Sequence, residues 1–417
     1  MKISKLQLPA LMISAFFNTA QAADCTPNSL NRPVCPANSA VETASYIDPT
    51  ATIFNPDIVT IAPHSYIAPF AAITATTAIH IGEKSNIQDN VTLNAVGPIN
   101  IGDEVILAHG ARVNGPATLG RSALPNKYNA SFIGFNSLLD GATLEYDAMI
   151  LHLARVSPGV IIRSGWVVLS GKNIATQAEA DNPALGKVIP ITDALRTFMA
   201  GVLHVNETFA REYSRLYYDN ATNVTGVNYD PSDNGAIPSF NPTRDLPVLA
   251  GVATRDPAYR NRIIGKVYME DTLAKLYDTR LVGYGVSLRA DEGEPFHFGA
   301  IGYMGNNTTV HALEHTSVTT SPQVTYGVRS LVHGGMSVAT QNNPEYATTV
   351  GTRASIGDYA VVFRSVVGDR AVIGCGSVVD GSTLPYSANI ASRTVVINYG
   401  HADYITYPVE WNPGCRR

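Results

Sequence analysis

Residues 101–120 read IGDEVILAHGARVNGPATLG, and this stretch decides the fold. An Ile-Gly step at Ile101-Gly102 is followed by a Leu-Gly step at Leu119-Gly120, and the interval of 18 residues is three steps of six. Small and β-branched residues lie between the two steps. A six-residue step is typical of a hexapeptide β-helix, in which each step supplies a short strand and a tight corner and three steps complete one coil. Glycine suits corners that need a positive φ.

Similar steps occur along most of the chain, in two copies. Those outside the first stretch are Ile81-Gly82, Ile133-Gly134, Ile264-Gly265, Val282-Gly283, Ile356-Gly357, Val367-Gly368 and Ile373-Gly374. A flat β-sandwich with scattered glycines is the alternative, but the six-residue register makes it the weaker interpretation. We therefore expect a mainly β protein with two tandem parallel β-helix domains of the hexapeptide-repeat type.

An amphipathic α-helix is expected after the first β-helix. Thr192-Asp193 has the character of a helix start. Apolar residues then recur at spacings of three and four, the period of a helix with one buried face. They are Leu195, Phe198, Val202, Val205, Phe209, Tyr213 and Leu216. We expect this helix to cover an apolar flank of the β-helix, with Asn206 beside the apolar stripe.

The expected segments follow from these patterns. Residues 219–245 are rich in Asn, Asp, Pro, Ser and Gly, which is typical of a linker or a long surface loop. The predicted segments are a signal peptide at 1–23, a first β-helix at 24–185, the helix at 186–218, a linker at 219–250, a second β-helix at 251–400 and a C-terminal tail at 401–417.

The composition is that of a globular protein with a large core. The chain has 417 residues, of which 45% are hydrophobic and 15% charged, and this length allows two or more domains. The net charge is −5 and the pI about 6.1. Because no basic patch is visible, we expect no nucleic-acid partner.

The N-terminus predicts export. Lys2 and Lys5 precede an apolar run from Leu6 to Phe17, and Ala20-Gln21-Ala22 follows it, as in a secretory signal cleaved near Ala22 or Ala23. A buried N-terminal helix is the alternative. No later run is apolar enough to span a bilayer. The mature protein is therefore expected in the periplasm or outside the cell, without a membrane partner.

Four cysteines fit an oxidising compartment, where an even count indicates disulfides. They are Cys25, Cys35, Cys375 and Cys415. A Cys25–Cys35 bond would close a short N-terminal loop, and a Cys375–Cys415 bond would hold the C-terminal tail. The sequence allows three connectivities.

The stretch from Arg289 to His333 concentrates groups that bind metals and move protons. It contains Arg289-Ala290-Asp291-Glu292-Gly293, then His311-Ala312-Leu313-Glu314-His315, and then Val332-His333-Gly334. Neutral imidazole is a common metal ligand, and a carboxylate near a metal-bound water is a candidate proton carrier. His311 and His333 are 22 residues apart, about one coil, and adjacent coils stack at roughly 4.8 Å. Both imidazoles can therefore reach one metal.

These motifs, in both halves, resemble the γ-class carbonic anhydrases, lyases that form trimers of left-handed β-helices. The first half resembles them at Ser45-Tyr46-Ile47-Asp48-Pro49, Ala68-Pro69-Phe70-Ala71, Ser85-Asn86-Ile87-Gln88-Asp89, Leu107-Ala108-His109, residues 176–181 and Val205-Asn206. The second half resembles them in the three runs quoted above. The resemblance implies two left-handed β-helices and a homo-oligomer with trimeric packing of β-helices.

In that family three histidines hold the metal, two from one subunit and the third from its neighbour. The first half keeps the donated histidine as His109, whereas the second half keeps the other two as His311 and His333. The replaced positions are Asn94 and Asn114 in the first half and Val328 in the second. The losses are reciprocal, so the resemblance implies one composite site between the two halves.

The resemblance also implies roles for six further residues: Asn86, Gln88, Asn206, Arg289, Glu292 and Glu314. Gln88 would orient the hydroxide, and Glu292 would carry the proton out with help from Glu314. An interface salt bridge between Arg289 and Asp291 is an equally good interpretation of that pair. The implied metal is Zn²⁺, with Fe²⁺ or Co²⁺ possible.

Not every histidine of the chain is expected to bind the metal. His315 is the alternative third ligand. It lies four residues from His311, however, and on a β-helix a side chain at that distance usually points in another direction. His80 and His297 are expected on the surface. Without the second half, His109 would be interpreted as a hydrogen-bonded interior histidine.

The implied reaction is the reversible hydration of CO2 to bicarbonate by metal-bound hydroxide. One alternative is a catalytically inactive β-helical assembly or scaffold protein, which the replacements at Asn94, Asn114 and Val328 favour. A second is a hexapeptide-type acyltransferase, which needs an acyl donor that an exported protein would not normally meet.

Overall fold

The structure is a computed structural model that describes residues 44–120, 130–219, 227–229, 260–265, 267–271, 273–292, 294–314, 316–335 and 347–416. The predicted signal peptide, Cys25, Cys35, most of the predicted linker and His315 lie outside the described residues.

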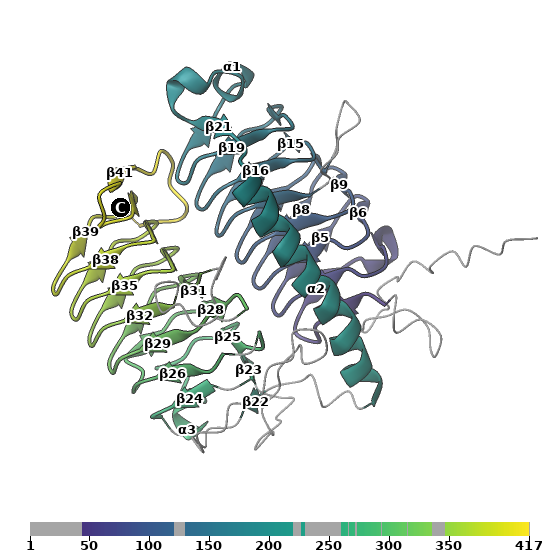
Figure 1. The fold of residues 1–417 in the computed structure, drawn as a ribbon. Helices are drawn as coiled ribbons and strands as arrows, with labels where there is room; N and C mark the ends of the chain where they lie inside the picture. The colour runs from purple at the N-terminus through teal and green to yellow at the C-terminus, as the bar shows by residue number, and fades with distance from the viewer. Residues whose placement is uncertain are drawn as a thin grey trace, which may run out of the picture.

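The first half is a left-handed β-helix of short parallel strands, as predicted, and we call it the first solenoid (Figure 1). Its three sheets are named by their first strands. The β1 sheet contains β1 (Tyr46–Ile47), β4 (Tyr66–Ile67), β7 (Asn86–Ile87), β10 (Val105–Leu107), β13 (Ser131–Ile133), β16 (Ala148–Ile150), β19 (Trp166–Val168) and β21 (Val188–Pro190). The β2 sheet contains β2 (Thr52–Phe54), β5 (Ala72–Ala75), β8 (Thr92–Ala95), β11 (Arg112–Asn114), β14 (Leu138–Asp140), β17 (Arg155–Val156) and β20 (Asn173–Ile174). The β3 sheet contains β3 (Val59–Ile61), β6 (Ile79–Ile81), β9 (Ile99–Ile101), β12 (Ala117–Leu119), β15 (Thr143–Leu144) and β18 (Ile161–Ile162).

The second half repeats this architecture and is called the second solenoid. The β22 sheet contains β22 (Val227–Tyr229), β23 (Arg262–Gly265), β25 (Ser287–Ala290), β28 (Thr309–Ala312), β31 (Leu331–Gly334), β34 (Val361–Phe363), β37 (Val378–Asp380), β40 (Thr394–Ile397) and β41 (Ile405–Pro408). The β24 sheet contains β24 (Val267–Met269), β26 (Phe296–Phe298), β29 (Val318–Thr320), β32 (Thr348–Val350), β35 (Val366–Val367) and β38 (Thr383–Leu384). The β27 sheet contains β27 (Tyr303–Met304), β30 (Thr325–Tyr326), β33 (Ser355–Ile356), β36 (Val372–Ile373) and β39 (Asn389–Ile390).

The register explains why the apolar steps decide this fold. Ile101 of β9 pairs with Leu119 of β12, so the 18-residue interval is one coil. Equivalent apolar residues stack on successive rungs inside the tube. One buried column consists of Ile47, Ile67, Ile87, Leu107, Ile133 and Ile150. Burying each of these side chains contributes about 1.5–3 kcal/mol.

Short helices interrupt the strands in both halves of the described chain. They are η2 (Pro56–Ile58), α1 (Gln177–Ala180), η3 (Pro183–Leu185) and α3 (Leu273–Leu276). The longer helix α2 (Asp193–Asp219) is the predicted amphipathic helix. At its start the backbone N–H of Leu195 donates a hydrogen bond to the Thr192 hydroxyl. No helix among the described residues is long and apolar enough to cross a membrane.

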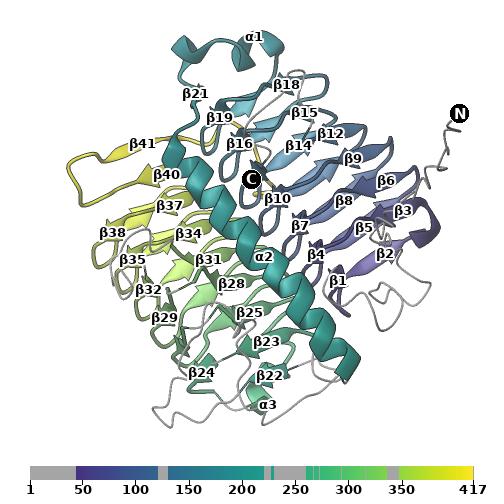
Figure 2. The same cartoon turned by 45° about the vertical axis from the view of Figure 1, so that its right-hand side comes forward.

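The two solenoids lie side by side, and α2 crosses the junction between them (Figures 1 and 2). Its buried face packs against both. Val205, Phe209 and Tyr213 contact Tyr46 and Tyr66 of the first solenoid. Met199 and Val202 join an apolar cluster to which strands of both solenoids contribute. The helix therefore covers the junction as well as the predicted flank.

The C-terminal segment, expected as a tail, is part of the second solenoid. Strand β41 pairs antiparallel with β40, and Cys375 is disulfide-bonded to Cys415, one of the pairings considered. Beyond β41, Trp411 reaches the first solenoid and donates its indole N–H to the carbonyl of Leu153 at 2.6 Å. The chain end thus fastens the two halves together.

Candidate metal centre

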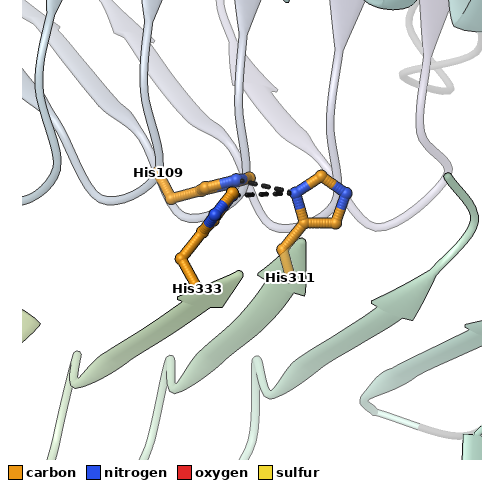
Figure 3. A group of neighbouring side chains, drawn as sticks. All are labelled: His109, His311 and His333. Carbon is orange, nitrogen blue, oxygen red and sulfur yellow. Dashed lines mark hydrogen bonds between the residues drawn. The ribbon is translucent and has the colours of Figure 1, made fainter. Parts of the chain in front are cut away.

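Three buried histidines meet at the junction. His311 of β28 and His333 of β31 are direct partners in the parallel register, so they stand on consecutive rungs of the second solenoid. His109 follows β10 at a corner of the first solenoid. Figure 3 shows the imidazole of His109 pointing toward the two others from the facing ribbon.

The nitrogen positions fit one metal ion. Nε2 of His109 lies 3.1 Å from Nδ1 of His311, which lies 3.2 Å from Nε2 of His333 (Figure 3). The three nitrogens all lie within 4.8 Å of one another. Ligands at 2.0–2.1 Å from a tetrahedral Zn²⁺ are roughly 3.3 Å apart. The cluster therefore has the ligand type and number of a three-histidine site, and two of its separations match those of such a site.

Burial keeps these imidazoles in the neutral, ligating form. All three side chains are at most 3% exposed. Burial lowers the pKa of His109 and His333, and burial with the nearby Arg289 charge lowers the pKa of His311 to about 4. Neutral imidazole is the form that binds metals.

A buried network of charged side chains contacts Nδ1 of His109 and Nε2 of His311. Oδ2 of Asp89, one coil before His109, lies 3.0 Å from Nδ1 of His109. Arg289 donates two hydrogen bonds to the same carboxylate, from Nε at 3.0 Å and from Nη2 at 2.8 Å. It also donates to Asp291, whose other oxygen is 3.3 Å from Nε2 of His311. Tyr213 of α2 donates its hydroxyl hydrogen to Asp291 as well. Arg289 thus holds one carboxylate behind each of two histidines.

The charges of this network are mutually compensated. Burial alone would raise the pKa values of Asp89 and Asp291. The charge of Arg289 and the hydrogen bonds from His109 to Asp89, and from His311 and Tyr213 to Asp291, together outweigh burial, so the pKa of Asp89 lies well below its usual range and that of Asp291 is about 2. Both carboxylates are therefore ionised at neutral pH. Arg289 therefore forms the ion pair with Asp291 that was one interpretation of its sequence context, and a further ion pair with Asp89 across the junction.

A small cavity adjoins two of the histidines. Its volume is about 10 Å³, room for about one water molecule. It is lined by Gln88, Phe132, Phe135, Phe198, Val202, Val205, Asn206, Glu292, His311, Leu313, His333 and Phe363. The walls are mainly apolar, and α2 supplies one side.

Two of the residues that line this cavity carry buried polar atoms without partners. Oε1 of Gln88 and Oε2 of Glu292 are buried and form no hydrogen bond with any described residue. Such orphaned atoms carry a desolvation cost unless a ligand or water satisfies them. They fit a hydrated metal ion beside the histidines. The amide of Asn206 also lines the cavity and donates to the carbonyl of Val202 at 2.8 Å.

Glu292 has the environment of a proton carrier. Its Oε1 lies 3.3 Å from Nε2 of His311. Burial raises the pKa of Glu292 well above its usual value, and the charges of Asp291 and Glu314 raise it further. A carboxyl group with a raised pKa can exchange a proton near neutral pH.

The other predicted residues are not among those that line the cavity. Asn86 in β7 is fully buried, and neither atom of its amide has a partner among the described residues, but it is not in the cavity wall. Glu314 is half-buried and acts on Glu292 through its charge. Asn94 is exposed, as are His80 and His297, which were expected on the surface.

The sequence reasoning missed three contributors. Asp89 ends the run Ser85-Asn86-Ile87-Gln88-Asp89. It lies one coil before His109, and this separation was the signal that it contacts that histidine. Phe135 packs against both His109 and His333, with ring centroids 5.6 and 4.9 Å apart. His152 stacks on Phe135 at 4.4 Å. No local signal marks these two, because their place depends on how the solenoids face each other.

Two known proteins are similar in sequence to parts of this chain. No known protein-family model matches the chain. A carbonic anhydrase of Methanosarcina thermophila is 28% identical over 190 residues, covering 44% of this chain and 73% of that protein. The carboxysome assembly protein CcmM of a Nostoc species is 28% identical over 128 residues, which are 30% of this chain and 22% of that longer protein.

Solved structures show only a weak overall likeness to this chain. A hexapeptide transferase family protein from Anaplasma phagocytophilum is 22% identical and has a TM-score of 0.28, with coverage of 41% of this chain and 93% of that one. An Arabidopsis UDP-N-acetylglucosamine acyltransferase is 11% identical with a TM-score of 0.23, covering 87% and 73%.

Proposed function

We propose that this protein is an exported metalloenzyme of the γ-carbonic-anhydrase type that hydrates CO2 reversibly to bicarbonate. The observation that carries the proposal is the convergence of His109, His311 and His333 across the junction of the two solenoids. The similarity over 190 residues to a carbonic anhydrase supports it. Each solenoid supplies only part of the ligand set.

The chemistry requires one metal and one proton route. Zn²⁺, Fe²⁺ or Co²⁺ held by the three histidines would lower the pKa of a coordinated water toward 7 and so would supply hydroxide at neutral pH. Hydration of CO2 to bicarbonate releases one proton, which must leave the site. Glu292 accepts that proton and passes it toward solvent, with Glu314 next on the route. Gln88 orients the attacking oxygen, and the apolar wall suits CO2.

The surrounding residues act by positioning. Asp89 and Asp291 orient the rings of His109 and His311, and Arg289 holds both carboxylates. Asn206 closes the cavity from α2. We further propose that the two solenoids of a chain occupy two places of a three-membered ring of β-helices, which makes the protein a homo-oligomer.

An assembly protein is the second candidate function. The similarity to the carboxysome assembly protein CcmM favours it. So does the loss of two ligand positions in the first solenoid, where Asn94 is exposed and the Asn114 amide donates to Asp140 at 3.0 Å. In that case the histidine cluster would be structural.

Metal analysis combined with a CO2 hydration assay decides between the two. We expect about one metal ion per chain and hydration activity in the purified full-length protein. His333→Ala should remove both, whereas His80→Ala, an exposed histidine, should change neither. Stoichiometric metal without hydration activity would favour the assembly function, and protein that neither retains nor takes up metal would refute the enzyme proposal.

A further inference from the structure

A second group of charged residues lies at the junction, away from the histidines. Arg112 of β11 belongs to the first solenoid, and Arg329, which follows β30, belongs to the second. Both side chains are largely buried but keep access to solvent. Nη2 of Arg329 lies 3.2 Å from the carbonyl oxygen of Gly110, two residues before Arg112, and burial together with the Arg329 charge lowers the pKa of Arg112 to about 10. Two positive charges are thus held together where the solenoids meet.

These guanidinium groups have no anionic partner among the described residues. The guanidinium group of Arg112 makes no hydrogen bond or ion pair there, and its Nε and Nη2 are buried without an acceptor. The guanidinium group of Arg329 donates only from Nη2, to the carbonyls of Asn90 at 2.9 Å and Gly110 at 3.2 Å, while its Nε has no acceptor. The neighbouring Arg155 is already paired with Asp140 at 2.9 Å. An unpaired buried charge is costly, so this arrangement calls for a counter-ion.

Aromatic rings shape the same place. The guanidinium carbon of Arg112 lies 5.3 Å from the centre of the Trp411 ring and 5.8 Å from that of Tyr359. Cation–π contacts of this kind offset part of the cost of burial but leave the N–H groups without acceptors. The Tyr359 hydroxyl also has no hydrogen-bond partner among the described residues and can donate to a ligand. Trp411 is fixed by its bond to Leu153.

We propose that Arg112, Arg329 and Tyr359 form a binding site for a small, doubly charged oxyanion such as inorganic phosphate or sulfate. The planar guanidinium fork matches two oxygens of such an ion, and two guanidinium groups match its two charges. Bicarbonate, with one charge, binds more weakly here. The ion binds an arginine of each solenoid. It therefore stabilises the junction on which the histidine cluster depends. This site is independent of the proposed reaction.

Calorimetric titration with inorganic phosphate tests the site. Full-length protein is used as purified and again after chelation, which removes binding to a metal, and sodium chloride keeps the ionic strength constant. We expect one phosphate per chain in both preparations and at least fivefold weaker binding of bicarbonate. Absence of saturable phosphate binding, or bicarbonate binding as tight as that of phosphate, would overturn the proposal.

Variants of Arg112 and Tyr359 locate the binding. Arg112→Gln should weaken phosphate binding at least tenfold, and Tyr359→Phe, which keeps the ring, should weaken it severalfold. The matched control is Arg163→Gln at an exposed ion pair with Asp181, where affinity should not change. If Arg112→Gln does not fold, Arg112→Lys keeps the charge without the fork and should still weaken binding. Unchanged affinity in the folded Arg112 variant and in Tyr359→Phe would overturn the assignment.

Discussion

Nε2 of His109 and Nδ1 of His311 are 3.1 Å apart, although 202 positions separate the two residues in the sequence. This contact makes the candidate site a property of the junction and not of either solenoid. His109→Ala should therefore reduce metal content and CO2 hydration as completely as His311→Ala. Elemental analysis and activity assays on both variants, purified in parallel, measure this effect.

The competing arrangement uses His315 as the third ligand and makes the opposite forecast. It predicts a mild effect of His109→Ala and a complete loss in His315→Ala. We expect His315→Ala to keep its metal and most of its activity. A purified second solenoid that bound one metal and hydrated CO2 by itself would also contradict the composite site.

Replacement of Glu292 tests the proton route. Glu292→Gln keeps the shape of the side chain but cannot accept the proton, so turnover should fall at least tenfold while metal content stays unchanged. Small buffers such as imidazole should restore part of the activity, because they can take over proton transfer. Stopped-flow assays at low and high buffer concentration measure both effects. Full activity of the variant in weak buffer would exclude this role.

The sequence predicted the fold well and the site incompletely, for physical reasons. The step from Ile101 to Leu119 specifies one coil because equivalent side chains must stack inside the tube, and the register confirms it. The antiparallel end strands β21 and β41 carry no six-residue signal and were missed. The pairing of Arg289 with Asp291 was considered, but its pairing with Asp89 could not be predicted, because it depends on how the two solenoids dock.

The Asp89–Arg289 pair should be essential for the junction. Asp89→Asn leaves the Arg289 charge buried and half compensated, so the free energy of unfolding should fall by about 3–5 kcal/mol. Asp181→Asn, at an exposed pair with Arg163, is the control and should cost no more than about 1 kcal/mol. Urea unfolding of both variants gives the comparison. A loss in Asp89→Asn no larger than in the control would show that the pair does not hold the junction.

Export and oxidation are tested together by mass spectrometry. We expect the mature protein to begin near Ala22 or Ala23 and to contain at least the Cys375–Cys415 disulfide, which holds the chain end that carries Trp411. Intact mass with and without reductant, after alkylation of free thiols, measures both features. Retention of Met1 with four free thiols would contradict the prediction.

The last prediction concerns the pH dependence of stability and rests on His152. Burial lowers the pKa of His152 to about 4, against 6.5 for an ordinary histidine. Between these values the unfolded chain binds a proton that the folded protein does not, so stability falls as the pH decreases from 6.5 toward 4. Above pH 6.5 the residue is neutral in both states and has no effect. The maximum contribution is about 3 kcal/mol.

His152→Gln removes this titration and keeps an acceptor for the backbone N–H of Phe135, which donates to Nδ1 of His152 at 3.2 Å. The unfolding free energy of the variant should therefore decrease less than that of the wild type between pH 6.5 and 4.5. Urea titrations of chelated protein at several pH values measure both slopes. The clustered histidines titrate in both proteins, so the difference between the slopes reports on His152 together with its electrostatic effect on His333. Identical slopes would mean that His152 titrates normally in the folded protein.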